Sequence, residues 1–363
     1  MNEGERQKIH QHLRPVFKLF KHLLSFSIEE LKFLEFDPLP LEDLVEICHY
    51  SRDIFSKEST LLNLEGEFRV IGDLHGHLPD LIRIFKKCGQ PSKHKYLFLG
   101  DFVDRGHFSV ETAMILFSLK VEYPNTIYIL RGNHEFEAIC RKSGLYEEIQ
   151  KLYGNDYLYE SMIETFSYLP LGAVLNNDIL CVHGGISPEL ETLDRFDTIA
   201  RPLNQLYGGI CDDILWSDPN PKVTGFQPSN RGNGVTFGED VLKKFLKSNN
   251  LRLLIRGHSF LKEGIQCLFK NKVITVFSAS NYCGIHNNKG GCLIIKKQKE
   301  EYIQFDPIYD IKRNFDKIDL KKNNRFYAKL PKVNSYQPCM LSPILSKVNI
   351  KTRHVKSTKI VLK

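Results

Sequence analysis

Five short apolar segments, each ending in a cluster of glycine, histidine and charged residues, constrain the fold of this chain more than any other feature. Four or five apolar residues bounded by glycine predict buried strands. Loops at strand ends are where a rigid sheet presents functional side chains, so five such loops together predict an active site. The predicted strands cover residues 68–71, 96–99, 127–130, 179–182 and 253–255.

The residue types in these loops indicate metal binding. Asp, His and Asn side chains without paired cysteines suit divalent ions such as Zn, Fe or Mn, and not a thiolate-bound structural zinc. The candidates are too many for one tetrahedral ion. They suit two ions, roughly 3.5–4 Å apart, that share a carboxylate and clamp both oxygens of an in-line displacement. The six candidate ligands are Asp73, His75, Asp101, Asn133, His183 and His258.

Two arginines in glycine-rich segments indicate a phosphate-binding site. Arg105 lies in the loop after the second predicted strand, and Arg231 lies in the segment 229–232. Their planar guanidinium groups can pair with phosphate oxygens as forks. Together with the metal ligands, they predict hydrolysis of a phosphate ester.

Six motifs follow one another in a specific order and spacing. They are GDLHG at 72–76, GDFVDRG at 100–106, LRGNHE at 130–135, HGG at 183–185, RGH at 256–258 and SASNYCG at 278–284. Between residues 40 and 307 the chain thus resembles the serine/threonine phosphoprotein phosphatases of the calcineurin-like superfamily, above all the type 1 and type 2A catalytic subunits. The resemblance implies an α/β fold with a central β-sandwich of mixed sheets flanked by helices. It also implies a dimetal site in the loops at the carboxyl ends of the strands.

The resemblance implies that Asp101 bridges two divalent ions, either manganese or iron with zinc. A hydroxide held between the ions then attacks phosphorus directly, without a phosphoenzyme. The other ligands divide between the ions, with Asp73 and His75 on the first and Asn133, His183 and His258 on the second.

The resemblance also implies how the leaving group departs. His134 protonates the serine or threonine oxygen, and Asp104 holds its imidazole in the required tautomer. Arg105 and Arg231 grip the phosphoryl oxygens and stabilise charge in the transition state. Tyr282 stands beside the phosphate. The substrate-binding residues are then Asn133, Arg105, Arg231 and Trp216.

Simpler interpretations remain open for single residues. An aspartate after a strand, such as Asp73 or Asp101, can cap the following helix instead of binding metal. Arg131 and Arg256 also follow strands, but we expect structural ion pairing there because the resemblance assigns them no phosphate contact. Trp216, the only tryptophan, fits the core and the wall of a substrate cleft equally well.

Three functions are compatible with these residues. The motifs favour a protein serine/threonine phosphatase, a metal-dependent hydrolase acting on phosphoproteins and directed by regulatory or targeting subunits. The alternative is a small-molecule phosphoesterase such as a symmetrical dinucleoside tetraphosphate hydrolase. A catalytically inactive scaffold would require a lost ligand, and all six are present.

Composition divides the chain into three parts. Residues 1–38 show helical spacing of apolar residues, which predicts a helical extension packed on the catalytic domain, residues 39–310, with a membrane-surface helix as the alternative. Residues 311–363 carry 14 Lys and Arg against 2 Asp, a net charge of +12, while the rest of the chain carries −5. This predicts a basic, partly disordered tail that takes no part in the chemistry. It binds an acidic partner or nucleic acid, or has no dedicated role.

Helix signals complete the pattern. Residues 41–55 predict a helix before the first strand, and residues 79–88 and 110–122 predict crossover helices. Ser109 is a candidate cap for the last of these, and Ser27 a candidate cap for a second helix in the extension. The alternation of strands and helices favours an α/β class.

The chain lacks the features of a secreted or membrane protein. No run of 18 apolar residues or signal-peptide pattern occurs, so we expect no membrane association. Nine cysteines without a Cys-x-x-Cys pair indicate reduced thiols, as in the cytoplasm or nucleus.

Four positions depart from the family pattern. His77 replaces a glutamine beside the first metal, and Ile285 replaces an acidic residue. Cys140 and Ser143 stand where an asparagine and a tyrosine are expected to line the substrate groove. The resemblance therefore implies the same chemistry, but it does not imply the same docking of regulatory subunits or the same sensitivity to inhibitor toxins.

Overall fold

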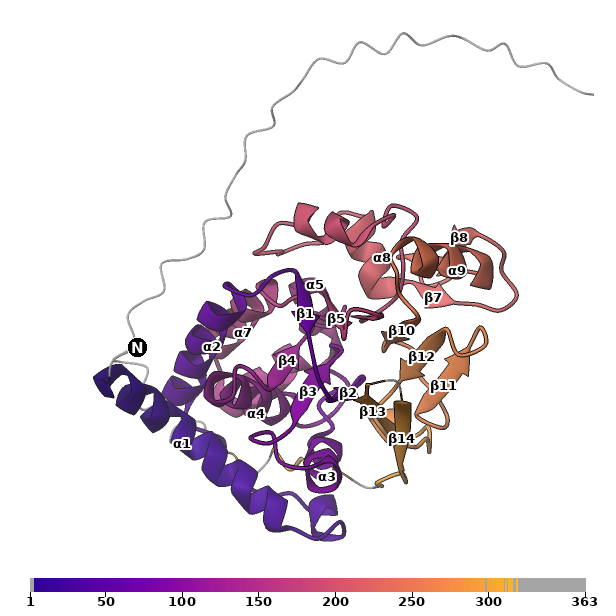
Figure 1. The fold of residues 1–363 in the computed structure, drawn as a ribbon. Helices are drawn as coiled ribbons and strands as arrows, with labels where there is room; N and C mark the ends of the chain where they lie inside the picture. The colour runs from indigo at the N-terminus through magenta and orange to yellow at the C-terminus, as the bar shows by residue number, and fades with distance from the viewer. Residues whose placement is uncertain (1–2, 298, 310, 312, 316–317, 319–363) are drawn as a thin grey trace, which may run out of the picture. The chain divides into compact units, whose positions relative to one another are not determined.

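The computed structural model describes residues 3–297, 299–309, 311, 313–315 and 318 (Figure 1). Two β-sheets pack face to face, and helices cover their outer sides. The predicted α/β fold with a central sandwich of mixed sheets is confirmed.

One sheet has five strands in the order β14-β13-β2-β3-β4. Strands β2, β3 and β4 are parallel and are connected through helices α3 and α4. Because parallel strands point the same way, the loops that follow them meet at one edge of the sheet. The bounds are β2 Phe68–Ile71, α3 Leu78–Cys88, β3 Lys95–Phe98, α4 Ser109–Glu122, β4 Ile127–Ile129, β13 Gly290–Lys296 and β14 Lys299–Phe305.

The other sheet has six strands in the order β1-β5-β6-β10-β12-β11. Strands β6, β10 and β12 are parallel, while β5 and β11 run antiparallel to β6 and β12. The loops after β6 and β10 therefore also lie at one edge. The bounds are β1 Leu61–Leu64, β5 Gly172–Leu175, β6 Ile179–Val182, β10 Leu253–Arg256, β11 Ile265–Leu268 and β12 Val273–Val276.

Apolar side chains fill the space between the sheets. Val70 of β2 and Ile255 of β10 belong to one buried cluster that contains residues of both sheets. A second cluster packs Leu254, on the outer face of β10, against Leu215 of α8 and Leu246 of α9. Successive residues 254 and 255 serve opposite faces, as the alternation of side chains along a strand requires.

The remaining elements lie around this sandwich. Phe85 of α3 packs edge-on against Tyr96 of β3, with ring centroids 5.0 Å apart, on the outer face of the five-stranded sheet. A small sheet in the order β7-β9-β8 follows α8. The bounds are α2 Leu41–Phe55, α5 Glu137–Ser143, α6 Leu145–Tyr153, α7 Tyr157–Ser167, α8 Ile210–Trp216, β7 Asp218–Pro219, β8 Phe226–Pro228, β9 Val235–Phe237 and α9 Glu239–Ser248, with short 3₁₀ turns at η1 Glu30–Lys32, η2 Leu193–Thr198 and η3 Tyr282–Gly284.

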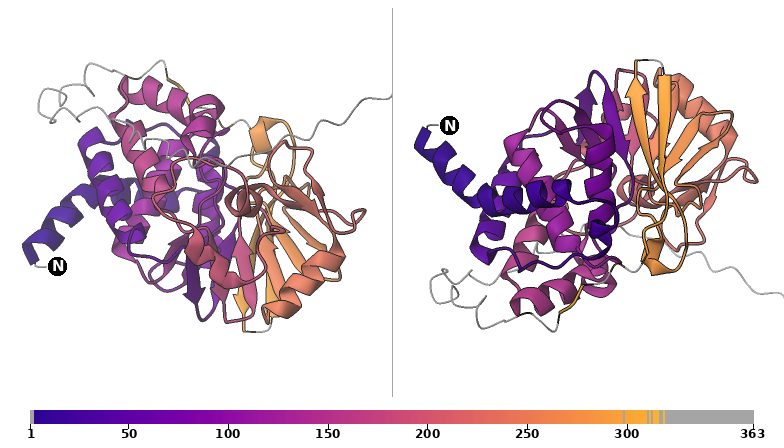
Figure 2. Two further views of the ribbon diagram at one scale, coloured as in Figure 1. Left: turned by 90° about the horizontal axis from the view of Figure 1, so that it is seen from above. Right: turned by 90° about the horizontal axis from the view of Figure 1, so that it is seen from below.

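The extension before the catalytic part forms a long helix, α1 (Glu3–Ser25), that lies against α2, α3 and α4 (Figure 2). Its apolar face, including Val16 and Phe20, is buried there. Ser27 and Glu30 then form a capping box, because the amide of Ser27 donates to Glu30 Oε2 at 2.6 Å and the amide of Glu30 donates to Ser27 Oγ at 3.2 Å. Only the single turn η1 follows, not a second α-helix.

The expectation that Ser109 caps α4 is wrong. Ser109 is the first residue of the helix, and its hydroxyl instead accepts a hydrogen bond from the amide of Asp104 at 3.1 Å. The cap comes from a distant element, since the carboxylate of Glu148 in α6 accepts the amides of Ser109 and Val110 at 3.0 and 3.1 Å.

Most of the predicted basic tail, 311–363, lies outside the described residues, so its disorder and its partners stay predictions. Within the described part of the chain, no helix is long and apolar enough to cross a membrane.

We expect Phe20→Ala to lower the free energy of unfolding by about 3 kcal/mol, because the substitution removes a buried ring from the interface of α1. Phe20 is 5% exposed and its ring lies 5.4 Å from that of Phe85. Denaturant unfolding measures the effect, with Phe33→Ala as control, since Phe33 is 76% exposed and its loss should change stability by less than about 0.5 kcal/mol. Equal values for both variants would mean that α1 does not dock.

Candidate active site

The loops after the parallel strands of both sheets are joined at one edge of the sandwich. The carbonyl oxygen of Asp101, after β3, accepts the amide of His75, after β2, at 2.9 Å. The carbonyl oxygen of Asp73 accepts the amides of Ser278 and Ala279, at 3.0 and 2.7 Å, from the loop after β12 in the other sheet. Backbone hydrogen bonds therefore hold the ligand-bearing loops together.

The six predicted metal ligands lie side by side at this edge, and all are buried. Neighbouring members of the set approach within 3.7 Å, and the set crosses from one sheet to the other. The atom pairs are Asp73 Oδ2–His75 Nε2 (3.7 Å), His75 Nε2–Asp101 Oδ2 (3.7 Å), Asp101 Oδ2–His183 Nε2 (3.3 Å), His183 Nε2–Asn133 Oδ1 (2.8 Å) and Asn133 Oδ1–His258 Nδ1 (2.9 Å).

Backbone carbonyls orient two of the imidazoles. Nδ1 of His75 lies 3.0 Å from the carbonyl oxygen of Val103, and Nδ1 of His183 lies 3.0 Å from that of Leu99. A ring that donates from Nδ1 keeps a lone pair on Nε2, the nitrogen that faces the carboxylates here. Both rings are thus held in the tautomer that a metal ligand needs.

The donor set fits a pair of divalent cations. Buried polar atoms normally have partners, yet Asp73 Oδ2 and His258 Nε2 are buried without a hydrogen bond. Two groups of side chains have ligand atoms within 4.8 Å of one another, and both contain Asp101. They are His75, Asp101 and His134, and Asp101, His183 and His258.

The buried carboxylates among the candidate ligands favour a bound cation. Burial and the neighbouring Asp101 raise the pKa of Asp73 to about 6. Burial and the charge of His134 lower the pKa of His75 to about 3, so that its imidazole is neutral. Against the effect of burial, the carboxylates instead raise the pKa of His183, above all through the charge of Asp101. A bound cation stabilises buried carboxylates and needs its imidazole ligands neutral.

Glycines next to the ligands leave no room for a side chain. A Cβ on Gly132 would lie 2.2 Å from Asp101 Oδ1, and a Cβ on Gly257 would lie 2.6 Å from Asp73 Oδ1. Both contacts are far shorter than any van der Waals distance. The glycines of the LRGNHE and RGH motifs therefore allow the loops of two sheets to close around the carboxylates.

Several of the predicted site residues have left-handed backbones. The φ angles are +46° at His75, +52° at Asp101, +69° at Asp104 and Arg105, and +66° at His258. Such conformations cost about 1–3 kcal/mol each for non-glycine residues and cluster at functional sites. Their concentration at this edge supports the assignment of the site.

Glu135 has a role that the sequence analysis missed. Its buried carboxylate accepts the amides of Asp101, Phe102 and Gly132, at 2.9, 3.0 and 2.8 Å. It thereby ties the loop after β3 to the loop after β4. Its position as the last residue of LRGNHE was the available signal.

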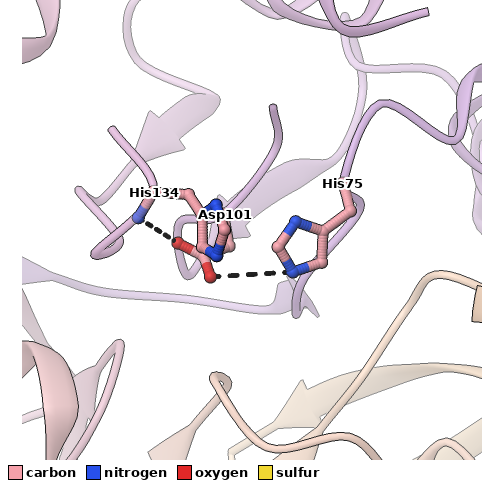
Figure 3. Close-up of side chains that lie close together, drawn as sticks. All are labelled: His75, Asp101 and His134. Carbon is pink, nitrogen blue, oxygen red and sulfur yellow. Dashed lines mark hydrogen bonds and ion pairs between the residues drawn. The ribbon is translucent and has the colours of Figure 1, made fainter. Parts of the chain in front are cut away.

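The two side chains of the predicted acid pair are in contact. His134 Nδ1 lies 2.8 Å from Asp104 Oδ2. The amide of His134 donates to Asp101 Oδ1 at 2.9 Å (Figure 3). Burial favours the neutral ring, but the charges of Asp101 and Asp104 outweigh it and raise the pKa of His134 to about 9. The ring is 4.8 Å from that of His75, so it faces the cluster of ligands (Figure 3).

The predicted phosphate and substrate residues surround the ligands. Arg231 Nε lies 2.5 Å from Asp218 Oδ2, which holds this partly exposed arginine in place, while Arg105 is exposed. The ring of Tyr282 lies 5.1 Å from that of His75. Trp216 is half-buried, with its ring 5.4 Å from that of His258 and the core behind it, so it belongs partly to the core, and its place in a substrate cleft stays a prediction.

Arg256 forms the expected structural ion pair, whereas the hydrogen-bond partners of Arg131 are backbone carbonyl oxygens. Arg131 is buried and donates to the carbonyl oxygens of Leu203 and Glu135. Arg256 donates to the carbonyl oxygen of Gly184 at 2.6 Å and to Asp218 Oδ1 at 3.0 Å.

The four departures from the family pattern take different positions. Nδ1 of His77 lies 2.7 Å from the buried carboxylate of Asp80. Cys140 is buried and its thiol donates to the carbonyl oxygen of His134 at 2.7 Å. The carbonyl oxygen of Ser143 accepts the amide of Arg105, and Ile285 is 76% exposed.

Comparisons with known proteins agree with this geometry. The model of the calcineurin-like phosphoesterase family matches residues 67–260. A protein serine/threonine phosphatase from Saccharomyces cerevisiae with similarity to human phosphatase PP5 is 33% identical, with a TM-score of 0.70, over 74% of this chain and 91% of that one. A cold-active protein-tyrosine phosphatase of a psychrophilic Shewanella species is 19% identical, with a TM-score of 0.48, over 72% of this chain and 83% of that one.

The matched region contains the ligand loops that follow β2, β3, β4, β6 and β10, from Asp73 to His258. The match covers more than half of the chain, and the yeast phosphatase extends it beyond these bounds. The chain belongs to the calcineurin-like phosphoesterase family and is a phosphoesterase hydrolase.

Proposed function

We propose that this protein is a serine/threonine protein phosphatase that hydrolyses phosphoserine and phosphothreonine in proteins. The observation that carries the proposal is the acid pair beside the ligand cluster, with His134 2.8 Å from Asp104 and its ring 4.8 Å from that of His75. An alkoxide leaving group needs such an acid. The 33% identity to a yeast protein serine/threonine phosphatase supports the same substrate class.

The six clustered side chains would hold two divalent ions, and Asp101 is the residue that both groups of candidate ligand atoms share. Bound ions supply an activated water nucleophile and neutralise phosphoryl charge. The chain itself keeps the ligands in the forms that bind cations. The carbonyl oxygens of Val103 and Leu99 fix the tautomers of His75 and His183.

His134 holds a proton for the leaving oxygen. Asp104 accepts from Nδ1, so Nε2 is the atom that donates to the substrate. With a pKa of about 9, the ring is protonated near neutral pH, as an acid requires. Once the proton has left, Asp104 and Asp101 favour its return from solvent.

Arg105 and Arg231 bind the phosphoryl oxygens. Arg231 approaches the site from the segment between β8 and β9, where Asp218 fixes its direction, and Arg256 in turn pairs with Asp218 at 3.0 Å. Tyr282 and Trp216 stand beside His75 and His258 and form walls for the substrate.

Turnover of a phosphoserine peptide, p-nitrophenyl phosphate and a symmetrical dinucleoside tetraphosphate by the Mn²⁺-loaded full chain tests the proposal. We expect hydrolysis of the peptide and the aryl phosphate, both abolished by a chelator and restored by Mn²⁺. Preference for the dinucleotide over the peptide would replace the protein substrate by a nucleotide one.

We expect Asp101→Asn to lower the metal content from roughly two ions per chain to one or none, because an amide cannot bridge two cations. Hydrolysis of every phosphate ester should fall more than roughly 100-fold. Elemental analysis of the purified protein measures the first effect. Asp53→Asn is the control, since the side chain of Asp53 is 59% exposed and far along the chain from the ligands.

We expect His134→Asn to keep its metal ions and to slow phosphopeptide hydrolysis by about 10²–10⁴-fold, the range of general acid catalysis. The defect should be much smaller for p-nitrophenyl phosphate, because p-nitrophenolate leaves without a proton. Equal losses on the two substrates would rule out the acid role.

We expect Asp104→Asn to move the alkaline limb of the pH profile of phosphopeptide turnover to lower pH. Asp104 helps to raise the pKa of His134, and the acid acts only while it is protonated. Loss of the carboxylate lowers that pKa, so activity fades earlier as pH rises. A profile unchanged from that of the unaltered protein would contradict the pairing.

A further inference from the structure

We propose that Arg313, in the segment after the last strand, is a positioning residue for the catalytic acid and acts through Glu111 and Glu148. This inference rests on the proposed function, because it concerns the alignment of His134 by Asp104. It also changes the expectation that residues 311–363 take no part in the chemistry.

Arg313 is inserted into the protein, with its side chain 5% exposed. Its guanidinium binds both oxygens of Glu111, at 2.8 and 2.5 Å, and Glu148 Oε1 at 3.3 Å. The ring of Phe108, the residue before α4, lies 5.1 Å below the guanidinium. A planar fork that pairs with one carboxylate and reaches another is a fixed contact, not the transient pairing of a surface arginine.

The two glutamates need this cation. Glu111 is fully buried and Glu148 is 4% exposed. Burial, followed by the charge of Glu111, raises the pKa of Glu148 to about 7, and Arg313 opposes the rise. Without the arginine, two neighbouring buried carboxylates repel, so that one of them must take up a proton or move.

Glu148 is the direct connection to the helix beside the acid pair. Its carboxylate accepts the first amides of α4, from Ser109 and Val110. An ionised carboxylate is the strongest cap for these amides, since it also faces the positive end of the helix dipole. Ser109 in turn accepts the amide of Asp104 through its hydroxyl, at 3.1 Å.

A second connection runs through α6. Leu145 begins this helix one turn before Glu148, and its amide donates to Asp104 Oδ1 at 2.9 Å. Asp104 Oδ2 is left for His134. Asp104 is therefore held by both helices, by α4 through its backbone amide and by α6 through its carboxylate. Glu148 joins these two helices and Arg313 holds them together.

The consequence is selective for one step of the reaction. Release of Glu148 would let α4 and α6 separate slightly and misalign Asp104, and with it the proton on His134. The metal ligands are organised by other contacts, such as those of Glu135, and should keep their ions. We therefore expect loss of Arg313 to slow phosphopeptide hydrolysis selectively, as His134→Asn does, but to a smaller extent.

The test is Arg313→Gln in the full chain. We expect kcat for a phosphoserine peptide to fall by about tenfold, kcat for p-nitrophenyl phosphate to stay within about twofold, and KM and metal content to stay unchanged, because only a poor leaving group needs the acid. Arg195→Gln is the matched control, as Arg195 is exposed. Arg313→Lys keeps the charge but loses the planar fork, so its kcat for the peptide should lie between that of Arg313→Gln and that of the unaltered protein.

A double variant and two truncations separate positioning from stability alone. Glu111→Gln in the Arg313→Gln background removes one of the two buried like charges and should restore most of the phosphopeptide turnover, with little change for p-nitrophenyl phosphate. The double variant also serves if the single variant does not fold. A chain ending at residue 310 should show the defect, whereas one ending at residue 318, which keeps Arg313, should not.

Equal losses on both substrates, or no loss on either, would overturn the inference. So would a defect that Glu111→Gln does not reduce. Failure of the proposed function looks different, because the unaltered protein would then hydrolyse aryl phosphates but no phosphopeptide. Phenyl phosphate would in that case replace the peptide as the substrate with a poor leaving group.

Discussion

The carboxylates of Asp73 and Asp101 are buried beside each other, and the arrangement of both sheets depends on stabilising them. Two neighbouring buried carboxylates are unfavourable without compensation. The amide of His258 binds Asp73 at 2.8 Å, and the amide of His134 binds Asp101 at 2.9 Å. Two of the loops that bring a candidate ligand thus also stabilise a carboxylate from another loop, and bound cations would compensate the charge that remains.

The sequence was informative wherever a short-range pattern carries the structure. Apolar runs that end at glycine gave the strands around the site to within about one residue, the usual disagreement at element ends. The contacts of Asp73 and Asp101 exclude the helix-cap alternative. The carboxylate of Asp73 binds the amide of His258 in the other sheet, and that of Asp101 binds the amide of His134, and neither contact caps the following helix.

Features that depend on contacts between distant segments could not be predicted from short-range sequence patterns. A serine before an apolar helix predicts a cap by local rules, yet Glu148, 39 residues further on, caps α4 in place of Ser109. Arg313 and Glu111 are 202 residues apart in the chain. The charge of the last segment indicated a solvated tail, because composition cannot distinguish one buried arginine from its exposed neighbours.

The division of the candidate ligands between two sheets would couple metal binding to folding. Asp73, Asp101 and Asn133 follow strands of one sheet, whereas His183 and His258 follow strands of the other, so the binding site exists only when the sheets are packed together. Metal ions that bind only the native state stabilise it by mass action. By the same linkage, a cavity in the core between the sheets weakens the hold on the ions, even when it lies far from every ligand.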